Sequence, residues 1–153
     1  AETRKRELAV QKNDWYLEFI DQMTAAEILP GVVPFLDHLQ AKGIKIALGS
    51  ASKNAVRVLT RTGILHYFET IVDGNSVVKG KPDPEVFLKG ASALAVAPAN
   101  CIVFEDAERG IEAALRGGFY AIGIGIPPAL DAAHLVIPNF ENKTLESLVA
   151  QLS

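Results

Sequence analysis

The apolar residues of the chain follow two spacings, one typical of amphipathic helices and one typical of buried strands. Leu8, Trp15 and Phe19 lie seven and four positions apart, which predicts one amphipathic helix over residues 2–23. The sequence LPG at 29–31 ends that helix. Further helices are expected at 32–42, 52–63, 84–95, 108–116 and 144–152, and strands at 44–49, 69–73, 101–105, 120–125 and 134–138.

Strands that alternate with helices in this way predict an α/β fold, with a Rossmann-like parallel sheet covered by helices on both faces. We expect the helical segment 1–27 to be separate from an α/β core at 28–153. Parallel sheets of this kind bind ligands at the carboxyl ends of their strands. The places to examine are therefore the residues just after 49, 73, 105 and 125.

Composition narrows the class of protein. The chain has 153 residues, 49% of them hydrophobic, which is enough for one sizeable core. A net charge of -3 gives no basic field for nucleic acid or an anionic membrane, and no apolar run approaches the roughly 20 residues of a membrane span. With the single cysteine Cys101 and no signal-peptide core near the N-terminus, we expect a cytoplasmic location.

The residues after the expected 44–49 strand are suited to an anion. Ser50 offers a hydroxyl, and the following helix offers free backbone N–H groups at the positive end of its dipole. The plainer interpretation is that Ser50 or Ser52 only caps this helix. Taken alone, the segment favours the cap.

A lysine stands in the segment KGKPDPEVF, residues 79–87, after the next expected strand. Lys81 lies just before a helix start, where a cation opposes the helix dipole. Asp83 and Glu85 offset its charge, and a ligand phosphate would do the same. Taken alone, Lys81 is most simply a solvated charge.

Two adjacent carboxylates follow the apolar run in CIVFEDAERGIEAA, residues 101–114. Asp106 can be explained as a helix cap, but Glu105, at the end of a covered strand, needs a partner. Mg²⁺ commonly takes one or two carboxylates together with phosphate and water. A hydroxyl, a lysine and an acidic pair at three strand ends together predict a site for Mg²⁺ and a phosphoryl group.

These segments resemble a known family. ALGSASKN at 47–54, KGKPDPEVF and CIVFEDAERGIEAA are similar, in order and spacing, to the second, third and fourth motifs of haloacid dehalogenase-like phosphotransferases. QKNDWYLEFI at 11–20 resembles the end of the helical cap domain in the phosphosugar mutases of that family. The resemblance covers nearly the whole chain. It implies that residues 1–27 are the C-terminal part of a cap and that 28–153 are the core.

The resemblance also implies roles for residues. The phosphate pocket would be formed by Ser50, Ala51, Ser52, Asn54 and Lys81. Ser50 and Lys81 would stabilise the phosphoryl group in transfer, Glu105 and Asp106 would be Mg²⁺ ligands, and Lys12 would reach a sugar phosphate from the cap. The implied reaction moves phosphate between C1 and C6 of β-glucose phosphates through an aspartyl-phosphate.

The family's first motif is not found in this chain. That motif is a central strand ending in Asp-x-Asp, which supplies the nucleophile and the general acid/base, and no two aspartates here are two positions apart. Two strand edges would be open without it. We expect an upstream segment or a second chain to complete the sheet, and we expect this chain alone to lack aspartyl-phosphate chemistry.

Other functions stay open at this stage. A phosphatase of the same superfamily, acting on a small sugar phosphate, would use the same motifs, although Lys12 and SASKN favour the mutase. A phospho-receiver is disfavoured because it carries its acidic pair after the first strand. A non-catalytic phosphate-binding role also remains. The expected partner is a sugar phosphate, with neither nucleic acid nor membrane.

Overall fold

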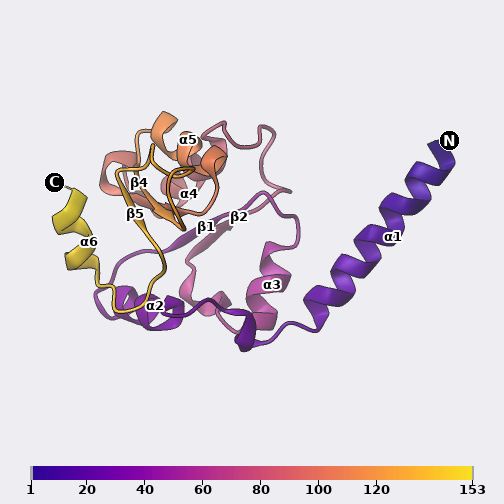
Figure 1. The fold of residues 1–153 in the computed structure, drawn as a ribbon, viewed down its shortest axis with the longest axis horizontal. Helices are drawn as coiled ribbons and strands as arrows, with labels where there is room; N and C mark the ends of the chain where they lie inside the picture. The colour runs from indigo at the N-terminus through magenta and orange to yellow at the C-terminus, as the bar shows by residue number, and fades with distance from the viewer. Residues whose placement is uncertain (1, 153) are drawn as a thin grey trace.

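The computed structural model describes residues 2–152, whose strands alternate with helices along the core (Figure 1). The helices and strands are α1 (Glu2–Asp21), α2 (Val32–Ala41), β1 (Ala47–Gly49), α3 (Ala55–Thr62), β2 (Thr70–Val72), α4 (Glu85–Leu94), β3 (Ile102–Glu105), α5 (Glu108–Arg116), β4 (Tyr120–Ile124), β5 (Leu135–Ile137) and α6 (Leu145–Leu152). Three short 3-10 helices join them, namely η1 (Ala25–Glu27), η2 (Leu65–Tyr67) and η3 (Pro98–Asn100).

The strands pair in parallel but form two sheets. β1 pairs with β2, with Ala47 opposite Thr70. The second sheet has the order β3-β4-β5, with Glu105 opposite Gly123. The predicted α/β class with parallel strands is confirmed. Among the described residues, β1 and β3 each have one hydrogen-bonded neighbour, so each keeps one unpaired edge.

Helices cover both faces of the strands, as predicted (Figure 1). On one face α4 packs on β1 and β2, and α5 packs on β3 and β4. The buried side chains there include Ala91, Val103, Ile111, Ala114, Phe119 and Ala121. On the other face α2 and α6 enclose a second cluster, formed by Phe35, Leu39, Ile122, Ile137 and Leu148. The two clusters hold β3 and β4 between helices, which fixes where the end of β3 lies.

Helix α1 projects away from the strands and meets the rest of the molecule near its C-terminal end (Figure 1). Ile20 is fully buried there, and the Asp21 carboxylate accepts a 2.7 Å hydrogen bond from Arg57 Nε of α3. Trp15 and Phe19 are 62% and 57% exposed. The helix ends two residues earlier than predicted, and its assignment to a cap domain stays a prediction. Across residues 2–152, no helix is both long and apolar enough to cross a membrane.

The two largest differences from the predicted boundaries are at the starts of β1 and α3. β1 covers only 47–49 of the expected 44–49 strand, and α3 begins at Ala55 rather than at residue 52. Between them, the backbone N–H of Ser52 donates to Ser50 Oγ, and that of Asn54 donates to Ser52 Oγ, both at 3.1 Å. Local side-chain acceptors compete with helix formation in this way. Residues 50–54 therefore form a separate loop, which we call the serine loop.

Candidate functional site

The Lys81 ammonium group bonds to residues at the ends of both β1 and β3. Lys81 Nζ lies 2.7 Å from Glu105 Oε2, at the end of β3, and donates to the Gly49 carbonyl, at the end of β1, at 3.4 Å. Both side chains are shielded from solvent, with Lys81 19% and Glu105 10% exposed. Lys81 Nζ also lies 4.8 Å from the centre of the Phe87 ring, a favourable cation–π position that the sequence did not reveal. Lys81 is thus not a freely solvated charge.

Glu105 uses both of its carboxylate oxygens. While Oε2 pairs with Lys81, Oε1 accepts the backbone N–H groups of Asp106 at 3.1 Å and Ala107 at 3.2 Å. The expectation that Glu105 needs a partner is confirmed. The alternative in which Asp106 caps the following helix is wrong, because Ala107 is the N-cap and it is Glu105 that accepts these N–H groups. Asp106 is exposed, and its carboxylate forms no hydrogen bond within the described chain.

Gly110 makes room for Glu105. A Cβ atom at Gly110 would lie 2.0 Å from Glu105 Cδ and 2.2 Å from Oε2. A Cβ atom essentially never lies within 3.0 Å of a non-bonded heavy atom, so a side chain at this position would displace the carboxylate. The close neighbour that requires a glycine at position 110 is therefore Glu105.

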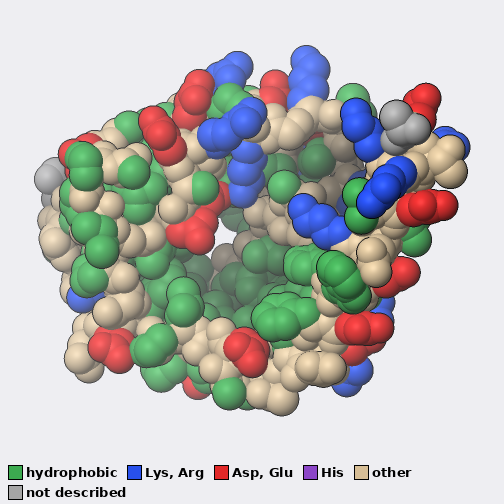
Figure 2. All heavy atoms as spheres, turned by 45° about the vertical axis from the view of Figure 1, so that its right-hand side comes forward, with side chains coloured by type: hydrophobic (Ala, Val, Ile, Leu, Met, Phe, Trp, Pro, Cys, Tyr) green, Lys and Arg blue, Asp and Glu red, His purple; other side chains and the backbone are tan. Residues whose placement is uncertain are grey.

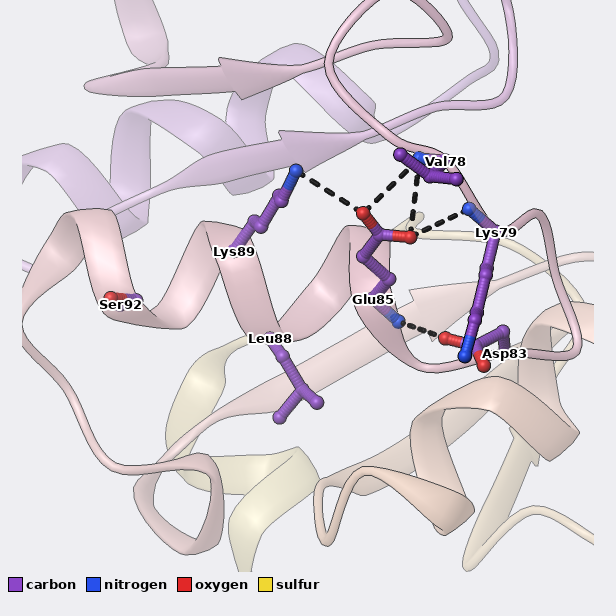
Figure 3. Close-up of a pocket in the computed structure, with 7 residues that line it drawn as sticks. All are labelled: Val78, Lys79, Asp83, Glu85, Leu88, Lys89 and Ser92. Atoms are coloured by element: carbon purple, nitrogen blue, oxygen red, sulfur yellow. Dashed lines mark hydrogen bonds and ion pairs between the residues drawn. The ribbon is translucent and has the colours of Figure 1, made fainter.

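The segment that carries Lys81 is held by Glu85, in the first turn of α4 (Figure 3). The backbone N–H of Lys79 donates to Glu85 Oε2 at 2.6 Å, and that of Val78 donates to Glu85 Oε1 at 3.1 Å. These hydrogen bonds, with that of Lys79 foremost, hold the pKa of Glu85 below its ordinary value. Glu85 therefore anchors the chain just ahead of Lys81.

The serine loop begins where β1 ends. The backbone N–H of Ser50 donates to the Val72 carbonyl at 2.9 Å, which continues the pairing with β2. Ala51 is exposed, Ser50, Ser52 and Asn54 are half-buried, and the loop leads into the N-terminus of α3. The Asn54 side chain forms no hydrogen bond to α3. The loop thus places two serine hydroxyls ahead of the N-terminus of α3, which is the positive end of the helix dipole.

Lys12 is the predicted site residue that the structure does not bring to the others. It lies in the middle of α1, is exposed, and contacts none of them. The helix itself stands apart from the strand ends (Figure 1). The role of Lys12 toward a sugar phosphate remains a prediction.

A shallow pocket lies on the outer side of α4, lined by Val78, Lys79, Asp83, Glu85, Leu88, Lys89 and Ser92 (Figure 3). None of the predicted site residues lines it. Glu85, which binds the backbone ahead of Lys81, is one of the lining residues. The pocket therefore adjoins the Lys81 segment and is separate from the predicted phosphate site.

The acidic pair can be tested for its fit to Mg²⁺. No cluster of three or more histidine, cysteine, aspartate or glutamate residues suited to a metal exists within 2–152. Glu105 and Asp106 nevertheless supply two carboxylates at one strand end, and Asp106 is free to turn toward a ligand. Because Mg²⁺ keeps several waters and uses one or two carboxylates plus phosphate, this donor set fits.

Parallel strands with an acidic pair, a lysine and a serine loop at their carboxyl ends define an α/β enzyme class that handles phosphate. A family model described as haloacid dehalogenase-like hydrolase matches residues 1–118. The chain belongs to this family.

Two individual members of the family are similar to this chain over most of its length. The chain is 42% identical over 144 residues to the beta-phosphoglucomutase of Bacillus subtilis (strain 168), covering 94% of this chain and 64% of that protein. It is 35% identical over 121 residues to hexitol phosphatase A of Escherichia coli (strain K12), covering 76% and 56%. It therefore spans less than two thirds of the length of these curated relatives.

A solved structure gives the same result for the fold. The crystal structure of beta-phosphoglucomutase from Clostridium difficile matches with a TM-score of 0.91 and 38% identity. The match covers 99% of this chain and 68% of that one. The arrangement of helices and strands, with α1 included, is thus that of a beta-phosphoglucomutase relative.

Proposed function

We propose that the working protein to which this chain contributes is a Mg²⁺-dependent phosphoglucomutase. It would interconvert β-glucose 1-phosphate and glucose 6-phosphate. The observation that carries the proposal is the shielded Lys81 ammonium, which joins the ends of β1 and β3 beside the start of the serine loop. The identity to beta-phosphoglucomutases over nearly the whole chain supports the choice of substrate.

The residues have distinct tasks in this proposal. Lys81 and the Ser50 hydroxyl would bind the oxygens of the phosphoryl group in transfer, where negative charge is spread over three oxygens. The N–H of Ala51 and the amide of Asn54 would orient that group. Glu105 and Asp106 would hold Mg²⁺, which neutralises phosphate charge when bound. Lys12 would contact the second phosphate of the sugar.

The nucleophilic aspartate of the family's first motif is not found in this sequence. We propose that an upstream segment or a second chain adds a strand between β1 and β3 and brings the two aspartates of the family's first motif. The separation of the strands into two sheets supports this proposal. Lys81 already spans the ends of the two strands that the added strand would join.

A product assay tests the function. The completed protein with β-glucose 1-phosphate and Mg²⁺ is expected to yield glucose 6-phosphate. Lys81→Ala should lower the rate by about a hundredfold or more, because it removes a charge that stabilises the transition state. Lys79→Ala is the matched control, since this exposed lysine lies two positions away and only its backbone is bonded. Equal rates for the two variants would remove Lys81 from the proposed role.

A phosphatase is the second candidate, because hexitol phosphatase A is among the relatives at 35% identity. The same Lys81–Glu105 geometry would serve hydrolysis of a small sugar phosphate. The two functions differ in product. Free phosphate without glucose 6-phosphate would favour the phosphatase and overturn the mutase.

A further inference from the structure

The ring of Phe87, in the first turn of α4, packs at the point where Lys81 meets the end of β1. The Lys81 Nζ atom lies 4.8 Å from the centre of this ring and 3.4 Å from the Gly49 carbonyl oxygen. A Cβ atom on Gly49 would lie 2.9 Å from Phe87 Cδ1 and 3.0 Å from Cε1, so the backbone of β1 lies against the same ring. Phe87 thus contacts both the lysine and the strand end to which that lysine bonds.

The Phe87 ring is backed by the hydrophobic core. The ring of Phe119, which is 5% exposed, lies edge-on to it, with the ring centres 6.1 Å apart and the planes at 68°. Phe87 packs against the buried cluster to which Phe119 belongs. Core packing therefore holds the ring in its place beside the ammonium group.

A ring face holds an ammonium group differently from a hydrogen-bond acceptor. Lys81 carries three N–H donors. Glu105 Oε2 accepts one of them at 2.7 Å, and the Gly49 carbonyl, at 3.4 Å, is a distant acceptor. The negative face of the Phe87 ring attracts the charge as a whole. Phe87 can therefore keep the ammonium in place while an N–H group stays available to a phosphate oxygen.

We propose that Phe87 is a positioning residue for Lys81: its ring face holds the ammonium at the ends of β1 and β3, beside the serine loop. The inference rests on the proposed function, in which Lys81 binds the phosphoryl group. It deepens that function by giving an electrostatic role to a side chain whose packing alone would suit another large apolar residue. Phe87 acts through the Lys81 ammonium, without a contact of its own to phosphate.

Fluorination of the ring separates this role from packing. A trifluorinated phenylalanine, introduced in place of Phe87 by nonsense suppression, nearly keeps the shape of the ring but weakens the negative charge of its face. The same replacement of Phe119 is the matched control, because Phe119 belongs to the same cluster and its ring is not the one beside Lys81.

Acetylation of Lys81 is the first measurement. Acetic anhydride reacts with the uncharged amine, so the rate at Lys81, followed by mass spectrometry, reports how well the charged form is held. The exposed Lys79 in the same sample is the reference. Fluorinated Phe87 should raise the relative rate at Lys81 about threefold, and fluorinated Phe119 should leave it unchanged.

Proton NMR of the unchanged chain gives a second test that needs no variant. Protons over a ring face are shifted upfield, so the Hε signals of Lys81 should lie upfield of those of Lys79. An ordinary position of the Lys81 signals would overturn the inference. So would an unchanged acetylation rate with fluorinated Phe87, or an equal change with fluorinated Phe119.

Phosphate binding separates this inference from the proposed function. In equilibrium dialysis with radiolabelled inorganic phosphate, fluorinated Phe87 should weaken binding about threefold, and fluorinated Phe119 should bind as the unchanged chain does. Full phosphate affinity with fluorinated Phe87 would overturn the inference. If acetylation responds as expected but the unchanged chain binds no phosphate, the hold of Phe87 on Lys81 is supported and the proposed phosphate site is overturned.

Discussion

At the scale of single residues, the site depends on space as much as on charge. Gly110 and Gly90 are both buried helical glycines, but only at Gly110 would a Cβ atom meet the Glu105 carboxylate, at 2.0 Å. At Gly90 the nearest atom would be Ala47 Cβ, at an ordinary 3.7 Å. The same substitution should therefore have opposite effects at the two positions.

We expect Gly110→Ala to destabilise the protein by about 1–3 kcal/mol, because the carboxylate must leave its place beside Lys81. Gly90→Ala should stabilise it by about 0.5–1 kcal/mol, since alanine favours a helix more than glycine does. Denaturant unfolding measures both free energies. If Gly110→Ala proves as stable as Gly90→Ala, the close contact with Glu105 does not govern this site.

The residue scale also shows what could be inferred from the sequence. The need of Glu105 for a partner follows from its place after an apolar strand, but the identity of that partner does not. Lys81 lies 24 positions earlier, and tertiary packing places its Nζ 2.7 Å from Glu105 Oε2. The hydrogen bonds from Gly74 to the Ser52 carbonyl and from Asn75 to the Lys53 carbonyl could not be predicted from the sequence either. They join loops whose conformations no periodicity predicts.

At the scale of elements, the hydrophobic pattern predicted the existence and order of all the α-helices and strands described. It failed at the starts of β1 and α3. Serine side chains in the 50–54 loop accept backbone N–H groups there, so the helix starts later than its apolar pattern. The short 3-10 helices were not predicted either, since one turn of helix leaves no periodic signal.

The attachment of α6 should depend on pH. Glu146 forms an ion pair with Lys42, and His38 Nε2 lies 3.1 Å from Glu146 Oε2, so α2 holds the first turn of α6. Bonding to Lys42 lowers the pKa of Glu146 from 4.5 to about 2. A carboxylate with a lowered folded-state pKa stabilises the fold fully above pH 4.5, and that contribution is lost as the pH falls toward about 2.

Glu146→Gln is expected to remove this part of the pH dependence. Unfolding midpoints of the variant and the unchanged protein should differ most above pH 4.5 and converge as the pH approaches about 2. Asp131→Asn is a control, because the carboxylate of that residue forms no ion pair and no hydrogen bond in the described structure. A constant difference across the whole range would show that Glu146 acts through packing instead of charge.

At the scale of the whole molecule, the two sheets leave strand edges unpaired. β1 and β3 each have an edge with no partner in residues 2–152, and Figure 2 shows a hollow whose walls carry hydrophobic side chains. Free strand edges favour pairing with another strand, and exposed apolar surface favours association. Among the described residues, no other strand is available to fill that place.

We therefore expect the isolated chain of 153 residues to self-associate, and to become monomeric when a strand is supplied. Light scattering would give its mass alone and with a synthetic peptide, an apolar strand ending in Asp-x-Asp. The control peptide has the same sequence except for a proline at its centre, which removes a backbone donor and cannot pair on both sides. The first peptide should bind and reduce association, and the control should do neither. A stable monomer without any peptide, or equal binding of both peptides, would contradict the proposed position of the added strand between β1 and β3.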